Sequence, residues 1–139
     1  MPAFVLDTGI LIRHLRRRRG FRALMERLAR EGDLIIASFT RLEVIRGMRN
    51  HERDQTMLLL NSLVSHALDI PTADLAGEFI RTQLARKKTI AGPDAVVGAT
   101  AIINNAVLIT TNPVHFALEG LNVYAVDEEG AVRSYRSPL

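Results

Sequence analysis

Short apolar stretches alternate with amphipathic helical stretches along the whole chain, and this alternation constrains the fold more than any other feature. Strands are expected at residues 3–6, 34–37, 67–70, 107–110 and 122–126. Helices are expected at about residues 21–32, 38–48, 52–65, 72–87 and 93–105, with a helical turn at 113–118. Short strands separated by helices favour a parallel sheet that is covered on both faces. The sequence therefore predicts an α/β fold with three layers, α/β/α, around a short and mostly parallel central sheet.

Length and composition fit a single domain over residues 1–139. Hydrophobic residues make up 47% of the chain and charged residues 24%, which is ordinary for a globular domain. No apolar run approaches the roughly 18 residues of a membrane span, and the N-terminus lacks the order of a signal peptide, so a cytoplasmic protein with no membrane contact is expected. The chain contains no Cys, which excludes disulfides, thiolate metal sites and cysteine nucleophiles.

Asp7 stands at the end of the first predicted strand, in "FVLDTG". Burying a carboxylate without a compensating partner costs several kcal/mol in practice, so a charge at this point needs an explanation. Ligands of parallel α/β sheets sit at the carboxyl ends of the strands. The position of Asp7 therefore indicates a functional site.

Glu43 and Asp94 are two further acidic candidates, and each also has a purely structural interpretation. Glu43 lies three residues after Thr40, which is the spacing of a helix capping box. Asp94 lies in the first turn of a helix opened by Pro93, where the helix dipole favours a negative charge. Small residues on that helix favour close packing against a sheet, which would bring Asp94 near the strand ends: Ala95, Gly98, Ala99 and Ala101.

Four motifs together resemble the PIN-domain family, and within it the VapC-type toxins of bacterial and archaeal toxin–antitoxin pairs. They are "VLDTGILI", "SFTRLEVIRG", "IAGPDAVVGATA" and "LITTNPVHF", in the order of the family and over nearly the whole chain. The resemblance implies a compact α/β/α fold in which acidic residues bind Mg²⁺ or Mn²⁺ and cleave RNA. Carried to the matching positions, it implies that Asp7, Glu43 and Asp94 are the catalytic residues and metal ligands.

The fourth motif departs from the family pattern. The family often adds a fourth acidic residue there, whereas this chain has Asn112 and His115. We expect one tight metal site, to which Asn112 could offer a carbonyl oxygen, and a second ion completed by substrate phosphate. Three carboxylates about 4 Å apart would repel by about 4 kcal/mol per pair at an effective dielectric of 20, and a hard divalent cation would remove that repulsion.

Three threonines are expected to support these carboxylates. Thr8 either bonds a ligand carboxylate or only caps its helix, and Thr40 either braces Glu43 or caps its own helix. Thr110 follows the strand of the fourth motif and is expected to lie beside the site.

The basic stretch "RHLRRRRG" has three open interpretations. It is a solvated helix end, an edge that binds RNA phosphates, or a contact for an acidic segment of the antitoxin. The residues expected to bind nucleic acid are Arg13, Arg16, Arg17, Arg18 and Arg19. Apolar residues in excess of one small core are either all core or, as the resemblance implies, partly the surface of a homodimer and of an antitoxin groove; they include Ile10, Leu11, Leu42 and Leu58–Leu60.

The function expected from these observations is a Mg²⁺- or Mn²⁺-dependent endoribonuclease, the toxin of a toxin–antitoxin pair. A phosphatase with Asp7 as nucleophile would need a second Asp two residues later, where Gly9 stands. The alternative that stays open is a degenerate PIN module that binds RNA or a protein without cleavage.

Overall fold

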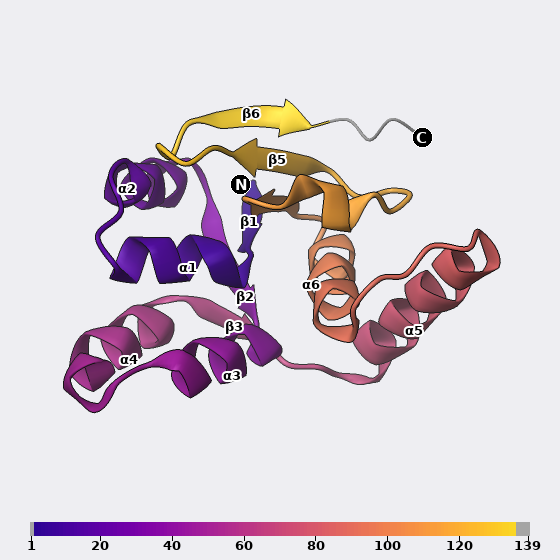
Figure 1. Ribbon diagram of the computed structural model, residues 1–139, viewed down its shortest axis with the longest axis horizontal. Coiled ribbons are helices and arrows are strands. Elements are labelled where there is room, and N and C mark those ends of the chain that lie inside the picture. The colour runs from indigo at the N-terminus through magenta and orange to yellow at the C-terminus, as the bar shows by residue number, and fades with distance from the viewer. Residues whose placement is uncertain (1, 136–139) are drawn as a thin grey trace.

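A six-stranded sheet forms the centre of the computed structural model, which describes residues 2–135 (Figure 1). The order across the sheet is β3-β2-β1-β4-β5-β6, and only β5 and β6 pair antiparallel. β1 therefore lies in the middle, and the carboxyl ends of five parallel strands share one edge. The strands are β1 (Ala3–Leu6), β2 (Asp33–Ala37), β3 (Val64–His66), β4 (Val107–Thr110), β5 (Val123–Val126) and β6 (Val132–Tyr135).

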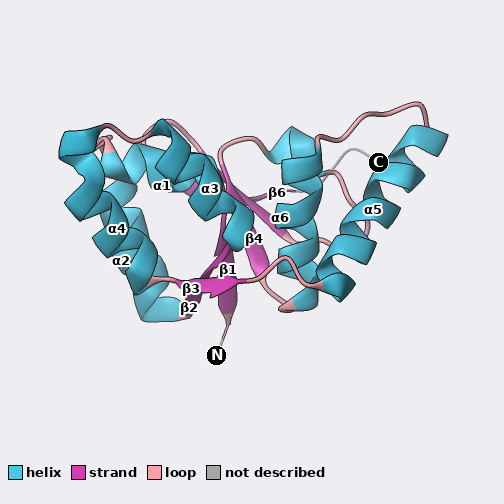
Figure 2. Ribbon diagram, turned by 90° about the horizontal axis from the view of Figure 1, so that it is seen from below, coloured by secondary structure: helices cyan, strands magenta, loops and turns pink. Residues whose placement is uncertain are grey.

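Helices cover both faces of the sheet, so the expected α/β/α architecture is confirmed (Figure 2). One face carries α1 (Thr8–Leu15), α2 (Phe21–Glu31), α3 (Ser38–Gly47) and α4 (Arg53–Ser62), and the other carries α5 (Ile70–Ala85) and α6 (Gly92–Ile103). Alternate residues of β1 point to opposite faces, so that Phe4 and Leu6 join one buried cluster and Val5 joins the other. Short 3₁₀ helices complete the chain: η1 (Asn50–Glu52) and η2 (Pro113–Phe116).

Small side chains let α6 pack closely on the sheet, as the sequence predicts. Ala95, Ala99 and Ala101 are fully buried, and α5 packs against the outer side of α6. A Cβ atom added at Gly98 would lie 2.9 Å from Leu118 Cδ1, so a larger residue there would force the Leu118 side chain to move. Within residues 2–135, no helix combines the length and the apolar character needed to cross a membrane.

The middle of the chain differs from the prediction. The helix expected over residues 52–65 ends at Ser62, because Val64–His66 pairs with β2 as the third strand. The prediction of a strand at residues 67–70 is therefore wrong, because the third strand ends at His66 and α5 begins at Ile70. The cap of α5 is Asp69, whose Oδ1 accepts a hydrogen bond from Thr72 N at 3.0 Å, so Thr72 is not the cap.

A hairpin that was not expected from the sequence joins β5 to β6. Asp127 Oδ1 accepts hydrogen bonds from the backbone N–H groups of Glu129 and Ala131, both at 2.9 Å, and this holds the turn. The tip of the hairpin packs against the loop between α1 and α2. A Cβ atom at Gly20 would lie 1.8 Å from the carbonyl oxygen of Glu129, so the two backbones touch and a side chain is excluded there.

Candidate active site

Asp7 is fixed at the carboxyl end of β1 by its neighbours on both sides. Its backbone N–H donates to Ile109 O at 3.0 Å, which extends the β1–β4 pairing by one residue. Its Oδ1 accepts from Thr8 N at 2.8 Å, and its Oδ2 accepts from the hydroxyl of Thr110 at 2.7 Å. Asp7 is therefore both the N-cap of α1 and the partner of the last residue of β4.

The surroundings of Asp7 favour its neutral form. Burial, the largest cause, raises the pKa of the carboxyl above its ordinary value of 3.8, and the negative charge of Glu43 raises it further. The hydrogen bonds from Thr110 and Thr8 oppose this shift in pKa because they stabilise the charged form, but they do not cancel it.

Glu43 reaches the same region from α3. The hydroxyl of Thr8 donates to Glu43 Oε1 at 2.7 Å and lies 3.5 Å from the hydroxyl of Thr40, which is fully buried. Thr8 is therefore not the cap of α1, which is Asp7; its backbone N–H contacts Asp7 and its hydroxyl contacts Glu43. The capping-box interpretation of Glu43 fails, since the N-cap of α3 is Ala37 and receives no side-chain hydrogen bond.

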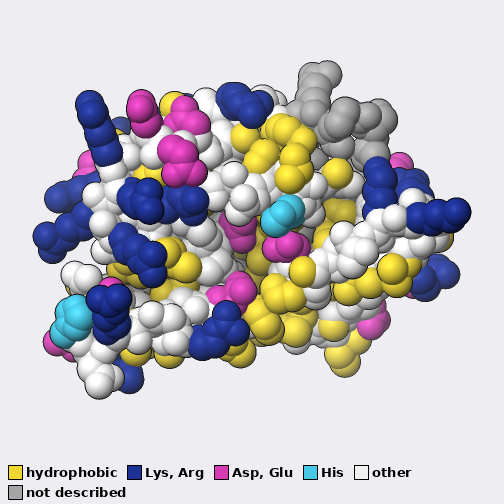
Figure 3. Space-filling view, in the orientation of Figure 1, with side chains coloured by type: hydrophobic (Ala, Val, Ile, Leu, Met, Phe, Trp, Pro, Cys, Tyr) yellow, Lys and Arg dark blue, Asp and Glu magenta, His cyan; other side chains and the backbone are white. Residues whose placement is uncertain are grey.

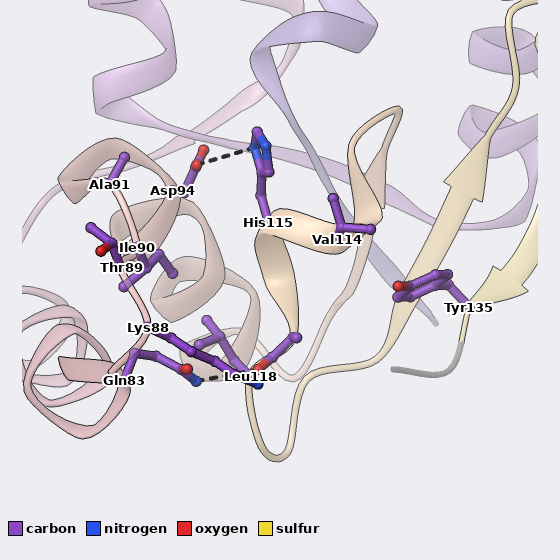
Figure 4. A pocket seen from close by; sticks show the side chains of 11 residues that line it. Gln83, Lys88, Thr89, Ile90, Ala91, Asp94, Val114, His115, Leu118 and Tyr135 are labelled. Atoms are coloured by element: carbon purple, nitrogen blue, oxygen red, sulfur yellow. Dashed lines mark hydrogen bonds and ion pairs between the residues drawn. The ribbon is translucent and has the colours of Figure 1, made fainter. Parts of the chain in front are cut away.

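Asp94 enters from the first turn of α6, on the other side of β1 and β4. Its Oδ2 lies 3.5 Å from Nδ1 of His115, a residue of η2 (Figure 4). Burial is the largest cause that raises the pKa of Asp94, followed by the charge of Asp7, and Glu43 adds to the shift while His115 opposes it. Asp94 is thus electrostatically linked to both other carboxylates.

These carboxylates are coupled electrostatically but do not form a finished metal cage. Figure 3 shows acidic side chains in a hollow at the centre of one face, next to a histidine. Among residues 2–135, however, no group of three or more His, Asp and Glu side chains is arranged so that it could hold a metal ion. The donors are all hard oxygens, which suits Mg²⁺ or Mn²⁺.

The segment after β4 is only partly as expected. Thr110 is fully buried and contacts Asp7, whereas Asn112 is exposed and contacts Thr110 through its backbone N–H at 3.0 Å. The role of Asn112 as a ligand stays a prediction. The hydroxyl of Thr111 is buried without a hydrogen-bond partner in the described part of the chain, and it faces Gly9.

The predicted basic stretch lies at the far end of α1 and in the loop to α2. Arg16–Arg19 are exposed, and Arg13 is partly buried. Glu128 of the unpredicted hairpin forms ion pairs with Arg13 at 3.6 Å and with Arg18 at 3.9 Å. The sequence "DEEG" at residues 127–130 was the available signal for this turn. The stretch is thus partly neutralised within the protein.

Known proteins are similar to most of this chain. A sequence profile of the PIN domain matches residues 4–119. Ribonuclease VapC19 of Mycobacterium tuberculosis is 30% identical over 115 residues, which cover 82% of this chain and 92% of that protein. Ribonuclease VapC10 of the same organism is 30% identical over 114 residues, which cover 82% of this chain and 86% of that protein.

Solved structures share the fold. VapBC2 of Rickettsia felis, bound to a DNA fragment from its promoter, matches with a TM-score of 0.75 at 22% identity, over 90% of this chain and 99% of that chain. A toxin–antitoxin complex from Klebsiella pneumoniae matches with a TM-score of 0.71 at 26% identity, over 84% of this chain and 92% of that chain. The resemblance inferred from the four motifs is confirmed. The chain belongs to the PIN-domain family, and its relatives include VapC ribonucleases.

Proposed function

We propose that the protein is a Mg²⁺- or Mn²⁺-dependent endoribonuclease of the cytoplasm, the toxin of a toxin–antitoxin pair. The observation that carries the proposal is the convergence of Asp7, Glu43 and Asp94 from three separate parts of the chain: burial raises the pKa of Asp7 and Asp94, and the charges of the neighbouring carboxylates raise it further. Perturbed carboxyls gathered at the strand ends of a parallel sheet are typical of an active site. The VapC ribonucleases among the relatives support the same chemistry.

The residues of the site have separate tasks in this proposal. Asp7, Glu43 and Asp94 would hold the divalent ion, with Asn112 as a further oxygen donor. Such an ion supplies charge neutralisation at the phosphate and makes water a better nucleophile at neutral pH. Thr110 and Thr8 orient Asp7 and Glu43 through their hydroxyls, as supporting partners of metal ligands do.

Product analysis tests the proposal. Purified protein is incubated with RNA in Mg²⁺ or in EDTA, and the ends of the products are identified. We expect cleavage that EDTA abolishes and that leaves 5′-phosphate and 3′-hydroxyl ends. Asp7→Asn, Glu43→Gln and Asp94→Asn should each abolish cleavage, whereas Asp74→Asn, an exposed acid of α5, should leave it unchanged. Cyclic phosphate ends, or full activity in EDTA, would contradict the proposal.

Binding without cleavage is the second candidate function. It is favoured by the exposed Asn112 at the position of a fourth acid and by the lack of a preformed three-ligand group among residues 2–135. A degenerate module would bind RNA in the same assay and leave it intact in every metal tested.

We further propose that RNA phosphates contact Arg13 and Arg16–Arg19. Each phosphate neutralised by an arginine adds to the salt dependence of binding. Changing Arg16–Arg19 to Glu should therefore reduce the slope of log affinity against log salt, whereas the same change at the exposed Arg27 and Arg30 of α2 should not. An unchanged slope would leave the stretch as a solvated helix end or a contact for the antitoxin.

A homodimer and an antitoxin groove are also part of the proposal. Ile10, Leu11 and Leu60 are fully buried and belong to the core, but Leu42 is 52% exposed and Leu58 is 74% exposed. The toxin–antitoxin complex from Klebsiella pneumoniae supports a protein partner. We expect light scattering to give twice the mass of the chain, and Leu42→Asp or Leu58→Asp to weaken either self-association or antitoxin binding.

A further inference from the structure

A cavity of about 520 Å³ opens beside Asp94, between the loop from α5 to α6 and the segment around η2. Its volume lies within the range of roughly 300–1,000 Å³ that small-ligand sites occupy. In Figure 4, Asp94 and His115 lie at one end and Lys88 at the other, with Tyr135 beyond Val114. None of the functions assigned above to the carboxylates accounts for this space.

The walls of the cavity are mostly apolar, although it reaches the surface. Ile90 and Leu118 form its buried floor. Val114 is 70% exposed at the rim, and the ring of Tyr135 adds an aromatic wall. Apolar and aromatic walls suit the flat face of a base, which every nucleotide offers regardless of sequence.

The two ends of the cavity differ in charge. Asp94 belongs to the carboxylate site, so a chain that reacts there passes the mouth of the cavity. Lys88 is exposed and forms no ion pair with any residue from 2 to 135, in contrast to Arg13 and Arg18, which contact Glu128. A free ammonium group at that end would attract a phosphate.

We propose that this cavity binds one nucleotide of the RNA next to the cleaved bond, with its base against Val114 and a phosphate near Lys88. The inference rests on the proposed ribonuclease function and adds a substrate-binding subsite to it. Single-stranded RNA fits because it combines a flat apolar face with an anion at close spacing, whereas a purely apolar ligand would leave Lys88 unused.

The subsite is tested by measuring whether the loss of a base from the RNA and the loss of a side chain from the cavity affect kcat/KM independently of each other. A short RNA that the protein cuts once is made in versions that each lack one base, leaving an abasic ribose. Loss of the base that occupies the cavity should lower kcat/KM about tenfold, which corresponds to about 1.4 kcal/mol. Val114→Ala and Lys88→Gln should lower kcat/KM on intact RNA about three- to tenfold, and Val114→Ala should cost little more on that one abasic RNA.

Two matched variants serve as controls. Ile103→Ala removes an exposed apolar side chain elsewhere, and Arg86→Gln removes an exposed cation just before the loop. Both should cut intact and abasic RNA as the unchanged protein does. If Val114→Ala lowers kcat/KM by the same factor on every abasic RNA as on intact RNA, the subsite is overturned, although the ribonuclease proposal is not. If the unchanged protein neither cuts nor binds RNA, the ribonuclease proposal fails and the subsite fails with it.

Discussion

Replacing Thr110 by Val removes one hydroxyl that serves two groups of the candidate site. Thr110 Oγ1 donates to Asp7 Oδ2 at 2.7 Å and accepts from Asn112 N at 3.0 Å. Thr110 and Asp7 are both buried, so water does not replace the lost donor. A hydrogen bond to a charged group contributes about 1.5–3 kcal/mol. We therefore expect Thr110→Val to lower the free energy of unfolding by about 2–3 kcal/mol at neutral pH, and Tm by about 7–10 °C.

The loss should depend on pH, with a sign that follows from Asp7. Because burial raises the pKa of Asp7 in the folded protein above 3.8, the folded protein binds this proton more tightly than the unfolded chain. Stability contributed by Asp7 therefore falls as the pH rises from about 3.8 through the folded pKa. The Thr110→Val change raises the pKa of Asp7 further and enlarges that fall. The difference in free energy of unfolding between the unchanged protein and Thr110→Val should thus be largest at neutral pH and shrink in acid.

Urea unfolding in EDTA at about pH 7 and about pH 4.5 measures both the loss of stability and its dependence on pH. The control is Thr110→Ser, which keeps the hydroxyl and loses a methyl group worth about 1 kcal/mol. The prediction is refuted if Thr110→Val lowers the free energy of unfolding equally at both pH values. It is also refuted if Thr110→Ser and Thr110→Val lower it equally at neutral pH.

Three further changes, the last with a control, have outcomes that follow from the contacts described above. Asp7→Asn removes a buried charge, so it should raise the free energy of unfolding in EDTA at neutral pH by about 0.5–2 kcal/mol, and calorimetry in acid should show the gain disappear. Thr8→Val removes the hydroxyl that bonds a glutamate of α3, and metal titration of activity should show affinity for Mg²⁺ about 10–100-fold weaker. Gly20→Ala places a Cβ atom 1.8 Å from Glu129 O, at a φ of +88°, and should cost about 3 kcal/mol in urea unfolding. Gly77→Ala, in an open position of a helix, should instead gain about 0.5–1 kcal/mol, and equal effects at the two glycines would contradict the contact.

The inner strands could be predicted from the sequence because they are buried on both faces. β1 and β4 have the bounds expected from their apolar runs. The edge strands could not, since β3 and β6 are short and largely exposed, and carry no apolar run. Their pairing with a neighbour decides their conformation, and a single stretch of sequence does not contain that partner. This is why a predicted helix ran through Val64.

In the candidate site, too, some features could be predicted from the local sequence, whereas others depend on distant parts of the chain. The strand-end position of Asp7 and the thin face of α6 could be deduced locally, and both lie where they were expected. The contact between Thr110 and Asp7 spans 103 positions of the chain and depends on the register that pairs Leu6 with Ile109. The ion pairs of Glu128 depend on a hairpin that only the folded sheet brings to the arginines. The ligand roles of the three carboxylates stay a prediction.

The central position of β1 also has a consequence during synthesis on the ribosome. One edge of β1 can pair with β2 once the first third of the chain has emerged, but the other edge waits for β4, near the end of translation. Until then the donor for Asp7 Oδ2 does not exist in the nascent polypeptide, and α6 has no complete surface to pack on. Chains that terminate early therefore lack an assembled site.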